Sequence, residues 1–452
     1  MPGPRSHSAF PTCTADPSRS RTLPAGEGPQ ARWGRQTGRG RIHFALLLLA
    51  GLVACGSGAE GNPEDSVQIE PSVEEVFRVG TVDGSGWEAF AQIRSLAFDA
   101  NGRLYILDTG QHHVVVLEPD GTFVRTIGSR GEGPEELRNP NGMTVLGTGE
   151  VAIYDMGHQA FLVFSPQGEF RRSIRAGIEE GMPDTRFFPH GSTGVVSVSR
   201  TRMIMRSGGE APAPPTTVPI RHFDLSGDGE TRVLHEAWLP VRDSRPTAVT
   251  VGGGGGMQIQ GSGIRAFEPT VHLAALPDGR LVVSDTSSYR MDLLGPEGEE
   301  LDRLGRDIRP QPVGDREREA ERERRMAGLE SGGGIQIQVA GGGGGGGGGI
   351  DTDAVREMLR GQLESMDFWH EIPIIERLAT DAQGRIWVGR NGGVGERGPT
   401  DLFSPEGEWL GTLPTDFGPI PGAFGPDGLA AWVETDDLDV PYVRVRRFGG
   451  LP

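Results

Sequence analysis

The sequence predicts an all-β fold, a six-bladed β-propeller with four-stranded antiparallel blades and with helical and glycine-rich insertions on one face. First, a polar turn with Gly followed by an apolar run stands at 98–110 as FDANGRLYILDTG and returns at 276–286 and 380–388. Second, a turn glycine follows the first strand of each unit, and the spacing fits repeats of about 40 to 50 residues, two of them enlarged by insertions. Third, the position five residues before these glycines is mostly small, as expected where inner strands crowd around an axis. The glycines are Gly102, Gly149, Gly194, Gly279, Gly384 and Gly428.

The first unit shows how one blade is built. Its four apolar, β-branched runs predict strands, and Asp, Asn, Pro and Gly between them predict tight turns. The second, fourth and fifth units repeat this order, and the third and sixth match it less well. The runs of the first unit are 93–99, 103–108, 114–118 and 122–128.

The last unit lacks a fourth strand of its own. Residues 75–81, EVFRVGT, resemble the fourth strands of other units but precede the first unit. A propeller closes when its N-terminal segment completes the last blade, because this pairs two edges that would otherwise stay open. We therefore expect 75–81 to be the outermost strand of blade six.

Three long insertions interrupt the repeat, at 202–217, 241–268 and 306–371. The first separates the second and third strands of blade three, and the other two link neighbouring blades. In a propeller, both kinds of connection lie at the rim where the innermost strands begin. All three insertions are therefore expected on one face, and long connections on one face are typical of a working surface.

The third insertion contains two predicted helices. Residues 314–330 place acids and arginines at helical spacing, and 351–369 have an apolar stripe. Glycine-rich stretches hold a QIQ segment at 258–260 and another at 336–338. We expect glycine linkers there; the alternative is that the two QIQ segments pair as short strands. The apolar stripe consists of Val355, Met358, Leu359 and Leu363.

The N-terminal region predicts export. Arg39 and Arg41 precede an apolar run, 42–54, that is too short to span a bilayer and has the charged, apolar, small order of an export signal. The run ends in Leu-Val-Ala-Cys at Cys55, which resembles the lipobox of bacterial lipoproteins. That resemblance implies cleavage before Cys55 and a lipid on its thiol.

Two other interpretations of this segment stay open: an ordinary signal peptide that happens to contain Cys, and a buried strand. On the lipobox interpretation, 1–54 is leader and signal peptide, 55–66 is the lipidated tether, and 67–452 is the propeller. The resemblance implies a cell-envelope protein. Gly56 stands where some bacteria use Asp for inner-membrane retention, which indicates the outer membrane.

Composition and charge narrow the function. A net charge of −18 argues against broad binding to nucleic acid or to an anionic membrane face. All 44 basic residues are arginine, so the glycine runs lack the Lys of a phosphate loop. No G-x-S-x-G nucleophile motif occurs. We expect no cofactor and assign no catalytic residue.

Two phrases resemble a known family. They are GSRGEGPEELRNPNG at 128–142 and DTGQHHVVVLEPDG at 108–121, which are similar to NHL-repeat propellers and to related six-bladed propeller lipoproteins of bacteria. The resemblance implies the fold. It leaves function open, because such propellers include binding modules as well as lyases and lactonases.

The starts of the inner strands offer candidate ligand-binding residues. Charged and polar side chains seven or eight positions before the turn glycines are expected to ring the mouth of the channel. Guanidinium groups bind carboxylates and phosphates through paired hydrogen bonds, so a small anion or an acidic peptide end would fit. The alternative is a set of inter-blade salt bridges, such as Arg94 with Glu376. The candidates are Arg94, Asn141, Arg186, His272, Glu376 and Arg377.

Three aspartates end the second strand of their blades: Asp108, Asp155 and Asp285. They are candidate metal ligands, but their recurrence favours a structural role in accepting backbone N–H bonds of the next turn. The histidines that follow lack any H-x-x-x-H spacing, so we expect no metal site. These histidines are His112, His113 and His158.

The residues thus predict a lipid-anchored envelope propeller that binds a small anionic ligand or a partner protein on its insertion-bearing face. Two alternatives remain. One is a propeller enzyme of lyase or lactonase type, with a metal held at the channel mouth by His272 or Glu376. The other is a scaffold subunit of an envelope complex.

Overall fold

The computed structural model describes most of the chain from residue 67 onward. Contacts divide the chain into two compact units, Met1–Glu60 and Gly61–Pro452, and all described residues belong to the second. The predicted leader, the lipidation at Cys55 and the tether lie outside the described residues. Within the described residues, no helix has the length and apolar character needed to cross a membrane. The described residues are 67–81, 84, 86–176, 181–200, 215–227, 229–241, 247–251, 257–261, 264–331 and 352–452.

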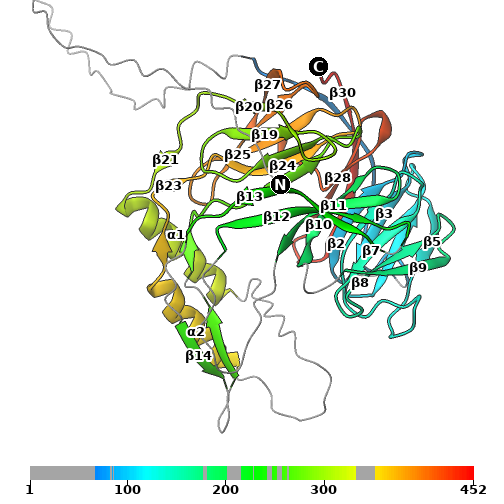
Figure 1. The fold of residues 1–452 in the computed structure, drawn as a ribbon, viewed down its shortest axis with the longest axis horizontal. Coiled ribbons are helices and arrows are strands. Elements are labelled where there is room, and N and C mark those ends of the chain that lie inside the picture. The colour runs from blue at the N-terminus through cyan, green and yellow to red at the C-terminus, as the bar shows by residue number, and fades with distance from the viewer. Residues whose placement is uncertain are drawn as a thin grey trace, which may run out of the picture. The chain divides into compact units, whose positions relative to one another are not determined.

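Six four-stranded antiparallel sheets form the blades of a propeller, which confirms the predicted fold class (Figure 1). Blades one to three consist of β2 (Ile93–Phe98), β3 (Leu104–Asp108), β4 (His113–Leu117), β5 (Phe123–Ile127); β6 (Pro140–Val145), β7 (Val151–Asp155), β8 (Ala160–Phe164), β9 (Phe170–Arg175); and β10 (Met182–His190), β11 (Gly194–Arg200), β12 (Thr217–Asp224), β13 (Thr231–Trp238). Blades four to six consist of β17 (His272–Ala275), β18 (Leu281–Ser284), β19 (Arg290–Leu294), β20 (Glu300–Gly305); β24 (Ile375–Thr380), β25 (Ile386–Asn391), β26 (Arg397–Phe403), β27 (Trp409–Leu413); and β28 (Ala423–Phe424), β29 (Leu429–Thr435), β30 (Pro441–Gly449), β1 (Ser72–Val79).

The N-terminal strand closes the ring, as predicted. Strand β1 pairs antiparallel with β30 from Ser72 to Val79, so it begins three residues before the predicted segment. The chain just before it also touches blade five: the amide of Ile69 donates to Thr412 at 3.0 Å. The segment therefore completes the last blade and reaches the edge of its neighbour.

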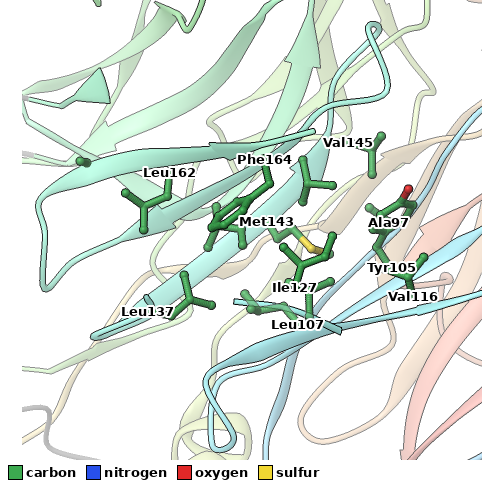
Figure 2. Close-up of a cluster of buried hydrophobic side chains, with 14 residues drawn as sticks. Ala97, Tyr105, Leu107, Val116, Ile127, Leu137, Met143, Val145, Leu162 and Phe164 are labelled. Carbon is green, nitrogen blue, oxygen red and sulfur yellow. The ribbon is translucent and has the colours of Figure 1, made fainter. Parts of the chain in front are cut away.

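Apolar side chains fill the space between neighbouring blades. Successive strand residues point to opposite faces, so Leu104 and Ile106 of β3 pack towards blade six, whereas Tyr105 and Leu107 pack towards blade two. Figure 2 shows Tyr105 and Leu107 beside Met143 of blade two in this cluster. Burying each such side chain stabilises the fold by about 1.5–3 kcal/mol. The apolar residues that alternate along each strand therefore provide the contacts that join neighbouring blades.

A left-handed glycine makes the turn between the first two strands of every blade. Five of the predicted glycines have φ between +74° and +90°, which Gly adopts at least cost. The prediction for blade three is wrong. Gly194 already belongs to β11, where it pairs with His190, and Gly191 makes the turn with φ +68°. The local sequence HGSTG offers two glycines, and the shorter turn uses the first.

The insertions leave the rim where the innermost strands begin, as predicted. The first lies between β11 and β12, the second between β13 and β17, and the third between β20 and β24. Most of the first, residues 201–214, lies outside the described residues.

The third insertion forms two helices, α1 (Asp315–Glu330) and α2 (Thr352–Glu364), which lie side by side (Figure 1). Helix α2 ends five residues before the predicted boundary. The reason is a short parallel pairing of β22 (Asp367–Phe368) with β16 (Arg265–Ala266) of the second insertion. A second short pair, β21 (Gln311–Pro312) with β23 (Glu371–Ile372), ties the base of the insertion together.

An apolar cluster joins the second and third insertions. Ala266 packs against Leu329 of α1, Leu363 of α2 and Met366, and all four side chains are buried. Leu363 and Leu359 belong to the predicted apolar stripe, and both pack in this cluster. The two insertions form one small body on the insertion-bearing rim.

The expectation of a glycine linker in the second insertion is wrong in part. Met257–Gly261, which contains the first QIQ segment, forms β15 and pairs antiparallel with β14 (Thr247–Val251). The segment TAVTV of β14 is rich in β-branched residues, which favour strands, and it provides the partner strand for β15. The second QIQ segment, 336–338, lies outside the described residues, so pairing between the two QIQ segments stays untested.

Candidate functional site

The innermost strands of blades three, four and five bring three of the predicted residues together. Strands β10, β17 and β24 are neighbours in the ring; His272 and Arg377 lie near the first residues of β17 and β24, and Arg186 lies in the middle of β10. Nη2 of Arg186 donates to the carbonyl oxygen of Leu378 at 3.4 Å, which spans from blade three to blade five. The charge of Arg186 acts on both His272 and Arg377, so the three side chains lie close together.

A cavity of about 70 Å³ lies at this position. Its polar side chains come from β10 and β17, and the rest of its wall is apolar. A cavity of this size can take only a small ion or a few waters, because sites for larger ligands enclose about 300–1,000 Å³. The lining residues are Asp184, Arg186, Phe188, Val198, Val271, His272, Leu273 and Leu378.

Arg186 is accessible to water and is also surrounded by the packed inner strands. Burial among them lowers its pKa, and the charge of Asp184 partly opposes that shift. Both properties fit a guanidinium on the wall of a narrow channel. Its Cζ lies 5.7 Å from the ring centre of Phe188, a contact that steadies the side chain beside the cavity.

Arg377 is half-buried and donates from Nη2 to the carbonyl oxygen of Pro421 at 2.8 Å. Its Nε is buried and has no hydrogen-bond partner among the described residues. Burial, followed by repulsion from Arg186, lowers the pKa of Arg377 to about 10. The group stays charged at neutral pH, so the site holds two cations that repel each other, and an anion between them would relieve this repulsion.

His272 is neutral at pH 7, because burial and then the charge of Arg186 lower its pKa to about 4. Its Nε2 lies 3.3 Å from the hydroxyl of Thr270. At neutral pH the imidazole can therefore donate or accept a hydrogen bond but adds no charge. The fixed positive charge comes from the two arginines.

The other three predicted residues occupy a different structural position. Arg94, Asn141 and Glu376 each fall at a register shift of β2, β6 or β24. Such bulges re-aim side chains relative to a regular strand. Arg94 and Glu376 are exposed and form no ion pair with each other, and Asn141 is buried. Counting positions from the turn glycine cannot detect these bulges.

Sequence reasoning missed Asp184, Phe188 and Leu378. Asp184 accepts the amide N–H of Thr185 at 2.7 Å, and its charge faces Arg186. The sequence prediction assigned only one or two residues of each innermost strand to the channel. The register shift in β10 between Pro183 and Phe187 exposes further residues there. No alternation marks this segment in the sequence, because 184–188 read DTRFF, so the pattern of residues offers no signal for the register shift.

The recurrent aspartates have mainly the structural role predicted. Asp108 and Asp155 are fully buried and accept backbone N–H groups, including those of Gly110 and His158 in the following turns. Asp285 differs, because it accepts the amide of Trp238 from blade three at 2.6 Å. These contacts hold strands in place.

No group of three or more His, Cys, Asp or Glu side chains could hold a metal ion among the described residues. His112, one of the weighed histidines, places Nδ1 3.0 Å from the carbonyl oxygen of Leu137. His158 places Nδ1 3.2 Å from Asp155. These two histidines make local contacts in blades one and two, away from Arg186 and Arg377.

Comparison with known proteins agrees with the fold. The sequence model of a family described as a 6-bladed beta-propeller matches residues 89–181. No curated protein matches the sequence.

Solved structures with overall likeness share little sequence. A Bacteroides fragilis protein described as exported has 11% identity and a TM-score of 0.44, covering 86% of this chain and 97% of its own. A gluconolactonase of Xanthomonas campestris has 12% identity and a TM-score of 0.35, covering 86% and 94%. Virginiamycin B lyase of Staphylococcus aureus has 8% identity and a TM-score of 0.39, covering 84% and 99%. The assignment of this fold rests on the strand pairing itself.

Proposed function

We propose that this propeller is a binding module that takes a small anion, with a carboxylate or phosphate group, between Arg186 and Arg377 in the channel. The observation that carries the proposal is the closeness of two guanidinium groups, of which Arg186 lines the channel cavity; the pKa of each is lowered by burial and that of Arg377 also by repulsion from Arg186. Arg377 forms no ion pair among the described residues, which leaves its charge available. Guanidinium forks suit planar anions.

The test measures the binding of phosphate, sulfate and citrate to the protein by calorimetry. We expect at least one of these probes to bind, and the double variant Arg186→Gln, Arg377→Gln to weaken that probe more than tenfold. The matched control is Arg94→Gln, which removes an exposed arginine of β2. Loss of binding in the control, or equal binding in the double variant, would refute the proposal.

The enzyme alternative requires a metal near His272 or Glu376. The described residues assemble no group of metal ligands there. The closeness of Arg186 and Arg377 is the observation that favours a binding module.

We further propose that the protein is exported and is anchored to a membrane by a lipid on Cys55. The support is the order of charged, apolar and small residues that ends at Cys55. In bacterial cells fed an alkyne-tagged fatty acid, the protein should acquire the tag, and Cys55→Ser should abolish it and release the protein from the membrane fraction. An equally tagged Cys55→Ser variant would exclude this cysteine as the anchor.

A further inference from the structure

Two histidines lie where blade three meets blade four, on the rim opposite the insertions. His190 is the last residue of β10 and is 5% exposed, and His222 lies on β12 and is half-buried. Their Nδ1 atoms are 2.9 Å apart. Nε2 of His190 lies 3.1 Å from the carbonyl oxygen of Gly279, in the turn after β17. The pair therefore connects two strands of blade three with the neighbouring blade.

Gly194 leaves room for this pair. It lies on β11, beside β12, and a Cβ at this position would collide with Cε1 of His222. The same Cβ would lie 2.9 Å from the carbonyl oxygen of His190, which is closer than Cβ atoms approach in proteins. Gly194 does not make the turn of blade three, and its lack of a side chain instead gives the His222 ring its place beside His190.

The contacts determine which ring nitrogens carry hydrogen. A carbonyl oxygen only accepts, so Nε2 of His190 donates to Gly279. A neutral imidazole carries one N–H group, so Nδ1 of His190 is an acceptor, and Nδ1 of His222 donates to it. A further proton on Nδ1 of His190 would bring two N–H groups face to face and break the contact. The connection between the strands therefore requires a neutral His190.

Two ion pairs and one further carboxylate lie around the histidines. Arg232 opposes a positive charge on either ring, and Glu297 favours it. Asp224, the last residue of β12, favours a protonated His222, but burial outweighs its effect. The ion pairs are Arg232 of β13 with Glu297 of the turn after β19, and Arg280 with Asp278 of the turn after β17.

Burial favours the neutral form of both rings. It lowers the pKa of His190, while the carbonyl groups of Gly279 and Pro296 partly oppose this shift. Burial, followed by the charge of His190, lowers the pKa of His222 to about 4. When the junction opens and water reaches the rings, each histidine returns to a pKa of about 6.5. Opening is therefore linked to the uptake of protons.

We infer that His190 and His222 form an acid-sensitive latch, which ties blade three to blade four when both rings are neutral and releases the junction when they take up protons. The latch is closed above pH 6.5, and its contribution is lost as the pH falls towards 4, because the open form binds protons more tightly than the closed form. Strands β10 and β17, which it helps to hold together, also line the cavity beside Arg186.

The experiment measures hydrogen exchange of the backbone amides in the turns 190–194 and 276–280 of the whole protein at pH 6 and pH 5. The amides of Leu104–Asp108 in blade one serve as an internal reference, which removes the direct effect of pH on exchange. Each proton taken up on opening raises the opening constant by at most about tenfold per pH unit. Exchange in the two turns should therefore rise by more than about tenfold relative to the reference, because two histidines titrate.

Three variants separate the two histidines from the rest of the protein. His222→Gln leaves one titrating ring and keeps an amide group that can donate to His190, so the rise should stay below about tenfold. The double variant His190→Gln, His222→Gln should show no rise. The matched control is His113→Gln, which removes a half-buried histidine of β4 whose pKa is also lowered by burial, and it should keep the full rise.

The NMR shifts of the ring nitrogens provide a test that needs no substitution. At pH 7 the unchanged protein should show the Nε2–H tautomer for His190 and the Nδ1–H tautomer for His222. The reverse assignment, exchange that does not respond to pH in the two turns, a full rise in the double variant, or loss of the rise in His113→Gln would each overturn the inference.

Discussion

Blades one and two differ from blades three and five at one repeated position. In β2 and β6, the residue near the start of the innermost strand pairs with Asp108 or Asp155 at the end of the second strand. Each of these buried carboxylates accepts the backbone N–H groups of the two residues just before the innermost strand of its blade. Asp108, for example, binds the amides of Ala91 and Gln92 at 2.8 and 2.9 Å. The same pairing position holds Ser199 in blade three and Arg390 in blade five.

This difference separates a structural role from a functional one. Where a buried aspartate clamps the approach to the innermost strand, the connections are short and the blade follows the repeat. In blades three and five, where the aspartate is replaced, an insertion interrupts or adjoins the blade, and residues of both blades line the channel cavity together with residues of blade four. A repeat position that every blade can use supports folding, whereas a departure from the repeat can create a single site.

The largest effect is expected for Asp155→Ala. It leaves the backbone N–H groups of Arg138, Asn139 and His158 without their acceptor in a buried position. Unsatisfied buried donors cost about 1–3 kcal/mol each when no water replaces the acceptor, so the free energy of unfolding should fall by about 3 kcal/mol in urea titrations.

The matched control is Asp285→Ala, since this half-buried carboxylate accepts one amide, from Trp238. Its loss should cost about 1 kcal/mol. Equal losses for the two variants would mean that blades one and two gain nothing special from their aspartates.

The next effect concerns acid sensitivity in blade three. Nδ1 of His222 lies 2.9 Å from Nδ1 of His190, and burial, followed by the charge of His190, lowers the pKa of His222 from 6.5 to about 4. The unfolded chain therefore takes up a proton near pH 6.5, whereas the folded chain does so only near pH 4. This group stabilises the fold above pH 6.5, and the contribution is lost as the pH falls towards 4. Partial exposure limits it to on the order of 2 kcal/mol.

The measurement compares urea unfolding at pH 7 and pH 4.5. His222→Gln should lose less stability on acidification than the unchanged protein does. His370→Gln, at a side chain 71% exposed, serves as the control and should keep the full acid dependence. The same acid dependence in all three proteins would assign it to other groups.

The smallest effect tests whether the channel cations oppose folding. Arg377→Met removes a half-buried charge whose pKa is lowered to about 10 by burial and by Arg186. It also removes the hydrogen bond to Pro421. We expect the free energy of unfolding to rise by about 1 kcal/mol while binding of the anion weakens, as in a site where function conflicts with stability. A marked loss of stability would instead make Arg377 a structural residue.

The sequence predicted part of the candidate site. Position counting from the turn glycines placed His272 and Arg377 near the starts of two neighbouring inner strands, whereas Arg186 was counted from Gly194, which is not the turn glycine of blade three. The same counting grouped Arg94 and Glu376 with them, although these residues fall at bulges. A bulge arises from how the strand meets its neighbours, so a periodic pattern does not reveal it.

Local chemistry was enough to determine the blades, the closure by the N-terminal strand and the side on which the insertions lie. Alternation, turn residues and repeat spacing act over a few residues, and they can be read along the chain. Only the tertiary structure decided that Arg186 and Arg377 lie close enough to repel each other and that Arg306 and Arg390 share Asp401. Those relations join blades far apart in sequence, and the energies of buried charges depend on neighbours that the linear order does not name.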